Sequence, residues 1–293
     1  MSMIRTCAAE GCVTLTLGER CIEHEAPISA SSFPRGRPHR PARASSKART
    51  ASKRALVVLA ALGLLIAIPS VGRSSGTATA YPMHTNIIAT VFWIGEPIGN
   101  GSTENNAISA YDDRWEGHFG GVDDYGYVRR YPYFPRFTPH ENPFYLDLPY
   151  DDFLDGGSPR PGRTADVPWA RADAVQVAAA AKRGNPFSLM KNRWVEISHT
   201  RNGSVHTCYG QIEDAGPYVY DDVGYVFGRD DRRPRSRRAR NAGMDVSPAL
   251  RDCLAFSGLD NDSNRVDWRF VDQGDVPAGP WLRVVTTRQV FWP

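Results

Sequence analysis

The sequence predicts a mainly β domain, a small barrel or sandwich with two helices, that follows a basic head and one long apolar segment. The large aromatic residues mark the domain, because all 7 Trp, all 12 Tyr and 11 of the 12 Phe fall at or after Tyr81. In that part, short runs of strand character outnumber helical ones, and Pro, Gly and Asp fill the segments between them. The first 80 residues hold one Phe and no Trp or Tyr, the side chains that dominate packed cores, so only the later part is expected to be an ordinary globular domain.

The charge is divided unevenly along the chain. The formal net charge is only +3, which argues against a dedicated nucleic-acid binder. Residues 1–54 carry ten Lys or Arg and four Asp or Glu, whereas residues 73–293 carry 25 and 28. Residues 27–54 contain eight basic residues and no acidic one. We expect this segment to be a disordered linker near anionic lipid headgroups, with nucleic-acid binding as a minor alternative.

An apolar run without charged side chains covers residues 55–72. Its length lies within the roughly 17 to 25 residues of a membrane-spanning helix, and a buried soluble helix is the weaker alternative. A cleaved signal peptide is the main competitor, because Ala78-Thr79-Ala80 resembles a cleavage site. The 54 residues before the run are long for a signal peptide, so an uncleaved signal-anchor is favoured. The basic flank predicts a single-pass protein in the cell membrane with a cytoplasmic N-terminus, a short linker at 73–83 and an extracytoplasmic domain at 84–293.

Three cysteines and a histidine are clustered in residues 1–26. Cys7, Cys12, Cys21 and His24 have the spacing C-x4-C-x8-C-x2-H, which suits a tetrahedral Cys3His zinc site in a reducing cytoplasm. Incidental free thiols in a disordered head are the alternative. A closed site of this kind would be structural or would dock a cytoplasmic protein, because four protein ligands leave no open position for a substrate.

The other two cysteines, Cys208 and Cys253, fall in the predicted extracytoplasmic domain. This compartment permits disulfides and the count is even, so we expect these cysteines to be bonded to each other. Two small buried thiols are the alternative. No cofactor is expected for this domain.

The elements of the domain follow from local patterns. Residues 84–93 predict a first strand, and residues 107–163, which show no period, predict long surface loops around short strands. A helix is expected at 169–183, with Asp166 as its cap. Asn202-Gly203 between two strand-like runs predicts a β-hairpin. The remaining expected elements are strands at 144–148, 194–199, 205–212, 224–227, 265–271 and 281–287, and a short helix that begins at Ser247 and Pro248.

The order of these pieces resembles a known family. NGSVHTCYGQIEDAGPY (202–218) joins a hairpin to a D-x-G-P turn, MDVSPAL (244–250) holds a D-x-S helix start, and Leu148-Pro149-Tyr150 stands near an L-P-F position. Together they resemble the double-psi β-barrel of the rare lipoprotein A and expansin superfamily. The resemblance covers roughly residues 84–110 and 142–287. It implies a small six-stranded double-psi β-barrel with long loop insertions and two short helices.

The resemblance also implies an acidic groove that acts on cell-wall polysaccharide such as peptidoglycan. In the family's enzymes the aspartate matching Asp214 is a general acid, so this chain is expected to be similar to a lytic transglycosylase or a glycosidase. The neighbouring Glu213 is expected to raise the pKa of one of the two carboxyls. Asp245 would be a second carboxylate or would orient the site. The alternative is that Asp214 caps a turn and Asp245 caps a helix.

The sequence departs from the family at one informative position. Relatives with lytic activity usually carry a histidine just upstream of L-P-F, where this chain has Tyr145. Expansin-like binding without bond cleavage is therefore the second hypothesis, and a membrane-anchored scaffold that links a cytoplasmic partner to the wall is the third. Tyr111, Trp115, Tyr145 and Tyr218 are candidates for stacking on sugar rings, with core packing as the alternative.

Overall fold

The computed structural model describes part of the 293-residue chain. The described residues are 5–6, 15–16, 81–98, 105–237 and 239–292. The chain divides into two compact units, Met1–Val71 and Gly72–Pro293. In the first unit, β1 (Arg5–Thr6) pairs antiparallel with β2 (Leu15–Thr16).

Two predictions fall on residues outside this description. The expected zinc ligands Cys7, Cys12, Cys21 and His24 are outside it, and so is the expected membrane helix at 55–72. Within the described ranges, no helix is both long and apolar enough to cross a bilayer. The zinc knuckle and the membrane anchor stay predictions.

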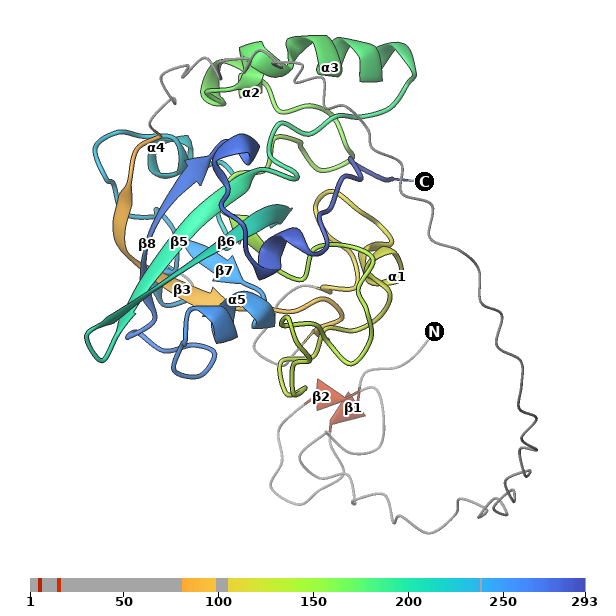
Figure 1. Ribbon diagram of the computed structural model, residues 1–293. Helices are drawn as coiled ribbons and strands as arrows, with labels where there is room; N and C mark the ends of the chain where they lie inside the picture. The colour runs from red at the N-terminus through yellow and green to blue at the C-terminus, as the bar shows by residue number, and fades with distance from the viewer. Residues whose placement is uncertain (1–4, 7–14, 17–80, 99–104, 238, 293) are drawn as a thin grey trace, which may run out of the picture. The chain divides into compact units, whose positions relative to one another are not determined.

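The second unit is built on a closed six-stranded barrel, shown in Figure 1. Around the barrel the strand order is β3, β7, β4, β6, β5, β8. The strands are β3 (His84–Val91), β4 (Tyr145–Leu148), β5 (Trp194–Arg201), β6 (Ser204–Ala215), β7 (Met244–Val246) and β8 (Arg265–Val271). β3 is parallel to β7 and β4 is parallel to β6, while the other neighbouring pairs are antiparallel. The mainly β prediction is confirmed, and this mixed barrel is compatible with a double-psi barrel.

The longest pairing of the barrel is the predicted hairpin. β5 and β6 pair from Trp194 opposite Gln211 to Arg201 opposite Ser204. Asn202 and Gly203 form the two-residue turn with φ values of 50° and 79°. Asn and Gly tolerate positive φ at both turn positions, which the tight hairpin turn requires.

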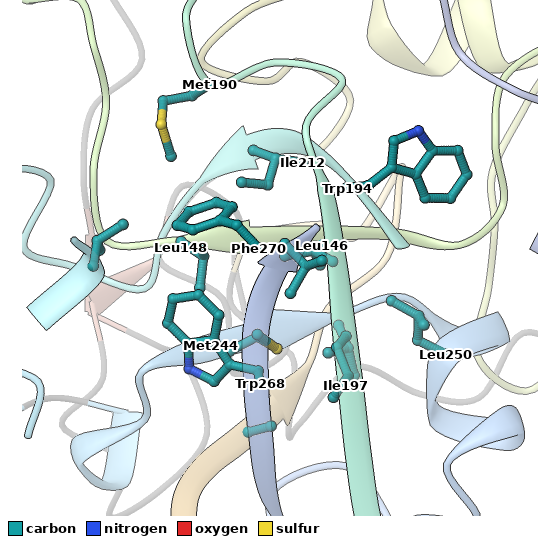
Figure 2. Packing of buried hydrophobic residues seen from close by; sticks show 14 of the residues in the cluster. Leu146, Leu148, Met190, Trp194, Ile197, Ile212, Met244, Leu250, Trp268 and Phe270 are labelled. Atoms are coloured by element: carbon teal, nitrogen blue, oxygen red, sulfur yellow. The ribbon is translucent and has the colours of Figure 1, made fainter. Parts of the chain in front are cut away.

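The barrel interior is filled by aliphatic and aromatic side chains that alternate with outward residues along each strand. On β4, Leu146 and Leu148 are fully buried, and on β8 Trp268 is fully buried and Phe270 almost so. Figure 2 shows these side chains close together between the strands. Burial of each such side chain contributes about 1.5 to 3 kcal/mol, so this interior is the main source of stability.

Short helices join and cover the strands. They are α1 (Trp115–Phe119), α2 (Arg163–Asp166), α3 (Ala170–Lys182), α4 (Val223–Val226) and α5 (Pro248–Cys253), with 3-10 turns at Ala239–Asn241, Gln273–Asp275 and Pro280–Leu282. The predicted helix at 169–183 is confirmed as α3, although Asp166 belongs to α2 and does not cap α3. The predicted start of α5 is also confirmed, because the Ser247 side chain accepts a hydrogen bond from Leu250 N.

Two predicted strands are wrong. The run at 224–227 is α4, because the Asp222 side chain accepts a hydrogen bond from Tyr225 N and begins a helical turn there. The run at 281–287 begins with the 3-10 turn Pro280–Leu282 and continues without strand pairing. β7 was not expected as a strand, because three residues are too few to show a period.

The segment 107–163, expected as surface loops, contributes a second layer of buried aromatic residues. Trp115 and Phe119 on α1 are fully buried and pack with Phe92, Ile94 and Tyr145. These residues form a cluster separate from the main core, on the face of β4 that points away from Leu146 and Leu148. The insertion therefore covers one side of the barrel.

The predicted disulfide is present. The sulfur atoms of Cys208 on β6 and Cys253 at the end of α5 are 2.04 Å apart. The bond connects residues separated by 45 positions and so ties α5 to the long hairpin.

Replacing both cysteines with serine should destabilise the domain. Without the disulfide, a loop of 45 residues is no longer closed in the unfolded chain. The chain-entropy model assigns about 4 kcal/mol to this closure, so we expect the free energy of unfolding to fall by up to this amount. Urea unfolding of the wild type with and without reductant measures the loss. In the Cys208→Ser, Cys253→Ser double variant the reductant should have no effect. Equal unfolding midpoints for the wild type and the double variant would contradict this assignment.

Candidate functional site

Three aspartates lie side by side on neighbouring strands. Asp147 on β4 pairs with Asp214 on β6 and also with Asp245 on β7, and Asp245 pairs in turn with Thr90 on β3. Residues at paired positions point to the same face of a sheet. We call Asp214, Asp147 and Asp245 the carboxylate row.

The carboxylate row lies on the covered side of the barrel strands. Leu146 and Leu148 point into the main core, so Asp147 between them shares the opposite face with Tyr145. Tyr145 is covered by the aromatic cluster around α1. Asp147 is 4% exposed, whereas Asp214 and Asp245 are half-buried. The row therefore runs along the border between the insertion and the exposed barrel surface.

Backbone amides and one hydroxyl hold the carboxylates. Asp214 Oδ1 accepts hydrogen bonds from Ala110 N at 2.7 Å and from Ala215 N at 2.8 Å. Asp147 Oδ1 accepts one from Asp245 N at 3.0 Å, and the Thr90 hydroxyl donates to Asp245. These bonds fix the orientation of each carboxylate relative to its neighbour.

The glycine of the D-x-G-P turn has a steric explanation. Gly216 follows β6 directly beside Asp147, and a Cβ atom at this position would lie 2.5 Å from Asp147 Oδ2. Any larger residue would therefore displace the central carboxylate. Glycine at 216 allows the chain to turn immediately after Asp214 without disturbing the row.

Glu213 does not belong to the carboxylate row. The register of β4 and β6 shifts between Leu146 and Asp147, so Glu213 is an extra residue that has no partner on β4. Its side chain is buried and forms an ion pair with Lys191 Nζ at 2.7 Å. The expectation that Glu213 raises the pKa of one of the two neighbouring carboxyls stays a prediction, and the structure directs its own carboxylate to Lys191.

The surroundings of Lys191 form a closed ionic cluster. Burial raises the pKa of Glu213 to about 7, and burial also raises the pKa of Glu141. Lys191 remains cationic because the nearby charges of both carboxyls outweigh its own desolvation and raise its pKa. Glu141 also forms an ion pair with Arg288 at 3.3 Å, so two cations compensate the two buried acids.

Three of the four aromatic candidates are core residues. Tyr111, Trp115 and Tyr145 have 0% exposure. The Tyr145 hydroxyl donates to Asp123 Oδ2 at 3.0 Å and accepts from Ile94 N at 3.0 Å. Rings buried in this way cannot stack on a sugar. These three residues instead pack in the core, which was the alternative interpretation. Tyr218 differs, because it is 47% exposed and lies only four residues after Asp214.

Two acidic residues of this site were not found by sequence reasoning. Asp147 stands in the run Tyr-Leu-Asp-Leu, where its alternation with two core leucines is the signal that could have revealed it. Glu96 follows β3 in a turn and is 5% exposed. Burial raises the pKa of Glu96 to about 7, and the charge of Asp245 contributes to the shift.

Within the described residues, no group of three or more His, Cys, Asp or Glu has an arrangement that could hold a metal ion. Comparisons with protein-family models, with curated proteins and with solved structures found no match for this chain.

Replacing Glu96 with glutamine should change how stability depends on pH. The pKa of Glu96 is about 7 in the folded protein against an ordinary 4.5, so between these pH values the folded state holds a proton that the unfolded state has released. The free energy of unfolding therefore falls as pH rises through this window. Glu96→Gln removes this contribution, and at pH 8 the variant should be more stable than the wild type by about 1 to 3 kcal/mol.

Urea unfolding between pH 4.5 and 8 measures this difference. Asp275→Asn is the matched control, because Asp275 is exposed and should leave the wild-type slope unchanged. If the free energy of unfolding of Glu96→Gln depends on pH as that of the wild type does, Glu96 is ionised in the folded protein across this pH range.

Proposed function

We propose that this protein acts on cell-wall glycan through a double-psi-type barrel, with the carboxylate row as its reactive site. The observation that carries the proposal is the register of Asp214, Asp147 and Asp245 on three adjacent strands. Two of these aspartates are the ones that the resemblance to the rare lipoprotein A and expansin superfamily singles out. The barrel adds a third carboxylate between them.

Under this proposal the three carboxylates of the row share a retained proton. Like charges at directly opposed positions repel, so full ionisation of the row is disfavoured. A retained proton is what a general acid needs in order to protonate a glycosidic oxygen. Asp214 is the proposed acid, because it is half-buried at the edge of the row and followed by the exposed Tyr218.

The strand spacing limits the possible mechanisms. Neighbouring strands are about 5 Å apart, so Asp214 and Asp147 have a separation near that of an acid and a nucleophile in retaining glycosidases. Asp214 and Asp245 lie on either side of β4, two strand spacings or about 10 Å apart, which is closer to the wider spacing of inverting enzymes. A lytic transglycosylase requires the acid alone, since a hydroxyl of the sugar attacks.

Binding without cleavage is the second candidate function, and two observations favour it. Asp214 Oδ1 accepts hydrogen bonds from two backbone amides, which stabilise its ionised form. Tyr145, at the position where lytic relatives usually carry histidine, is fully buried and offers no acid or base to a substrate. Under this hypothesis the row binds sugar hydroxyls in the manner of an expansin.

Asp214→Asn distinguishes the two functions. If Asp214 is the general acid, the wild type releases soluble sugar fragments from purified peptidoglycan, and the variant should release at least a hundredfold less. Mass spectrometry of the soluble fraction measures release, and co-sedimentation with peptidoglycan measures binding.

Asp275→Asn serves as the control and should act as the wild type does. If the wild type sediments with peptidoglycan but releases nothing, the binding function holds. If it neither binds nor releases, both functions are wrong.

A further inference from the structure

A small pocket lies between the insertion at 107–163 and residues 285–288 near the end of the chain. Its volume is about 230 Å³, whereas a protein cavity of about 150 Å³ is already large enough to bind benzene. The polar side chains in its wall include His118, His140, Glu141, Thr287 and Arg288. We call this feature the histidine pocket, and it shares no residue with the carboxylate row.

A buried carboxylate holds His118 in one orientation. The His118 Nδ1 atom lies 2.9 Å from Asp112 Oδ1 and 2.7 Å from Asp112 Oδ2, and Asp112 is 0% exposed. An ionised carboxylate only accepts hydrogen bonds, so Nδ1 carries the proton of the neutral ring and Nε2 is an acceptor. The ring also makes a T-shaped contact with Phe291, with centroids 4.9 Å apart. His118 therefore brings a fixed hydrogen-bond acceptor to the pocket.

A carboxylate oxygen of Glu141 is a second acceptor in the pocket. Glu141 is 5% exposed, and its Oε1 atom accepts a hydrogen bond from Arg288 Nε at 3.3 Å. Among the described residues, Glu141 Oε2 is buried and has no hydrogen-bond partner. A buried acceptor without a donor is destabilising, and more so when it is charged. A donor group that enters the pocket would remove this cost.

The charges around the pocket favour a cationic ligand. The ion pairs of Lys191 and of Arg288, described above, each balance one acid. Asp112 is the third acid of this region, and its charge reaches both Glu141 and Lys191. Its own ion-pair partner is His118. When the imidazole is neutral, these groups together hold one negative charge in excess.

The wall at 285–288 is firmly attached to the barrel. Thr286 N donates to Gln211 Oε1 at 2.9 Å, and Gln211 Nε2 donates to Thr286 O at 3.1 Å. The Asn192 Nδ2 atom donates to Arg288 O at 3.0 Å. A wall fixed in this way is already formed before a ligand arrives, so binding costs little conformational entropy.

We infer that the histidine pocket binds a small primary amine, whose ammonium group donates to His118 Nε2 and Glu141 Oε2. A primary ammonium has three N–H donors, which is enough for both acceptors and for the Thr287 hydroxyl in the same wall. Its charge offsets the excess negative charge of the region. This binding site is independent of the proposed function, because no residue of the carboxylate row takes part.

Titration of the full-length protein with ethylammonium chloride at pH 8 tests the inference, and saturation-transfer difference NMR measures the binding. Ethylammonium should bind saturably. Tetramethylammonium carries the same charge but has no N–H donor, so it should bind at least about tenfold more weakly. Acetate should not bind. A wild type that binds no ethylammonium, or that binds acetate more tightly, overturns the inference.

Arg288→Gln distinguishes a cation site from an anion site. The Arg288 side chain is 46% exposed, so its replacement should leave the fold intact. Loss of its positive charge beside Glu141 should lower the Kd for ethylammonium about two- to fivefold. Arg283→Gln is the matched control, because Arg283 is exposed on the same segment outside the pocket and should leave the Kd unchanged. A higher Kd in Arg288→Gln would contradict a cation site.

Two further variants test the acceptors. His118→Asn can still donate to Asp112 but has no acceptor at the Nε2 position, so the Kd for ethylammonium should rise about three- to tenfold. His206→Asn, on the hairpin, should bind as the wild type does. Glu141→Gln should raise the Kd at least about tenfold, and its urea unfolding midpoint shows whether it is folded.

The wild-type Kd in His118→Asn, or in a folded Glu141→Gln, overturns the inference. Neither result concerns peptidoglycan, so the proposed function is tested separately through Asp214→Asn. Asp214→Asn should itself bind ethylammonium with the wild-type Kd, because Asp214 does not line the pocket.

Discussion

The position of β7 between β3 and β4 is the constraint on which both the barrel and the candidate site depend. This strand has only three residues, yet it pairs parallel with β3 on one side and antiparallel with β4 on the other. Without it the barrel would be open between those strands, and Asp245 would not reach the side of Asp147. The two residues of β7 on either side of Asp245, Met244 and Val246, are fully buried. Their burial contributes about 1.5 to 3 kcal/mol each, which exceeds the roughly 1 kcal/mol or less that opposed like charges cost.

The same balance explains how the fold tolerates a row of acids. Asp147 and Asp245 each stand between two residues whose side chains fill the core, and Asp214 precedes the buried Ala215. The strands are therefore held by apolar burial and not by the polar face. The mutual repulsion of the carboxylates is small beside the packing that fixes the strands. A polar network of this kind, on strands with a strong apolar face, is typical of sites that proteins maintain at a cost in stability.

Local signals in the sequence were sufficient for part of this structure. The hairpin at Asn202-Gly203, the helix α3, the start of α5 and the disulfide followed from turn chemistry, periodicity and cysteine count. Asp214 and Asp245 were found through short motifs. Asp147 was missed because a single aspartate in a four-residue strand has no spacing to recognise, and its importance arises only from pairing with distant strands. The displacement of Glu213 from the row depends on a bulge in the pairing of β4 with β6. The burial of Trp115 depends on how the insertion folds over β4. Neither is a local property of the sequence.

The helix α5 joins features that are otherwise far apart in the chain. Its capping residue Ser247 follows the strand of Asp245, Arg251 in its last turn holds the Tyr125 carbonyl, and Cys253 at its end is bonded to the hairpin. A helix of six residues has no room for these attachments to move independently. Any tilt of α5 would be transmitted to the acids, the segment around Tyr125 and the hairpin at once. The redox state of one sulfur pair is thereby mechanically linked to the placement of the carboxylate row relative to the segment around Tyr125.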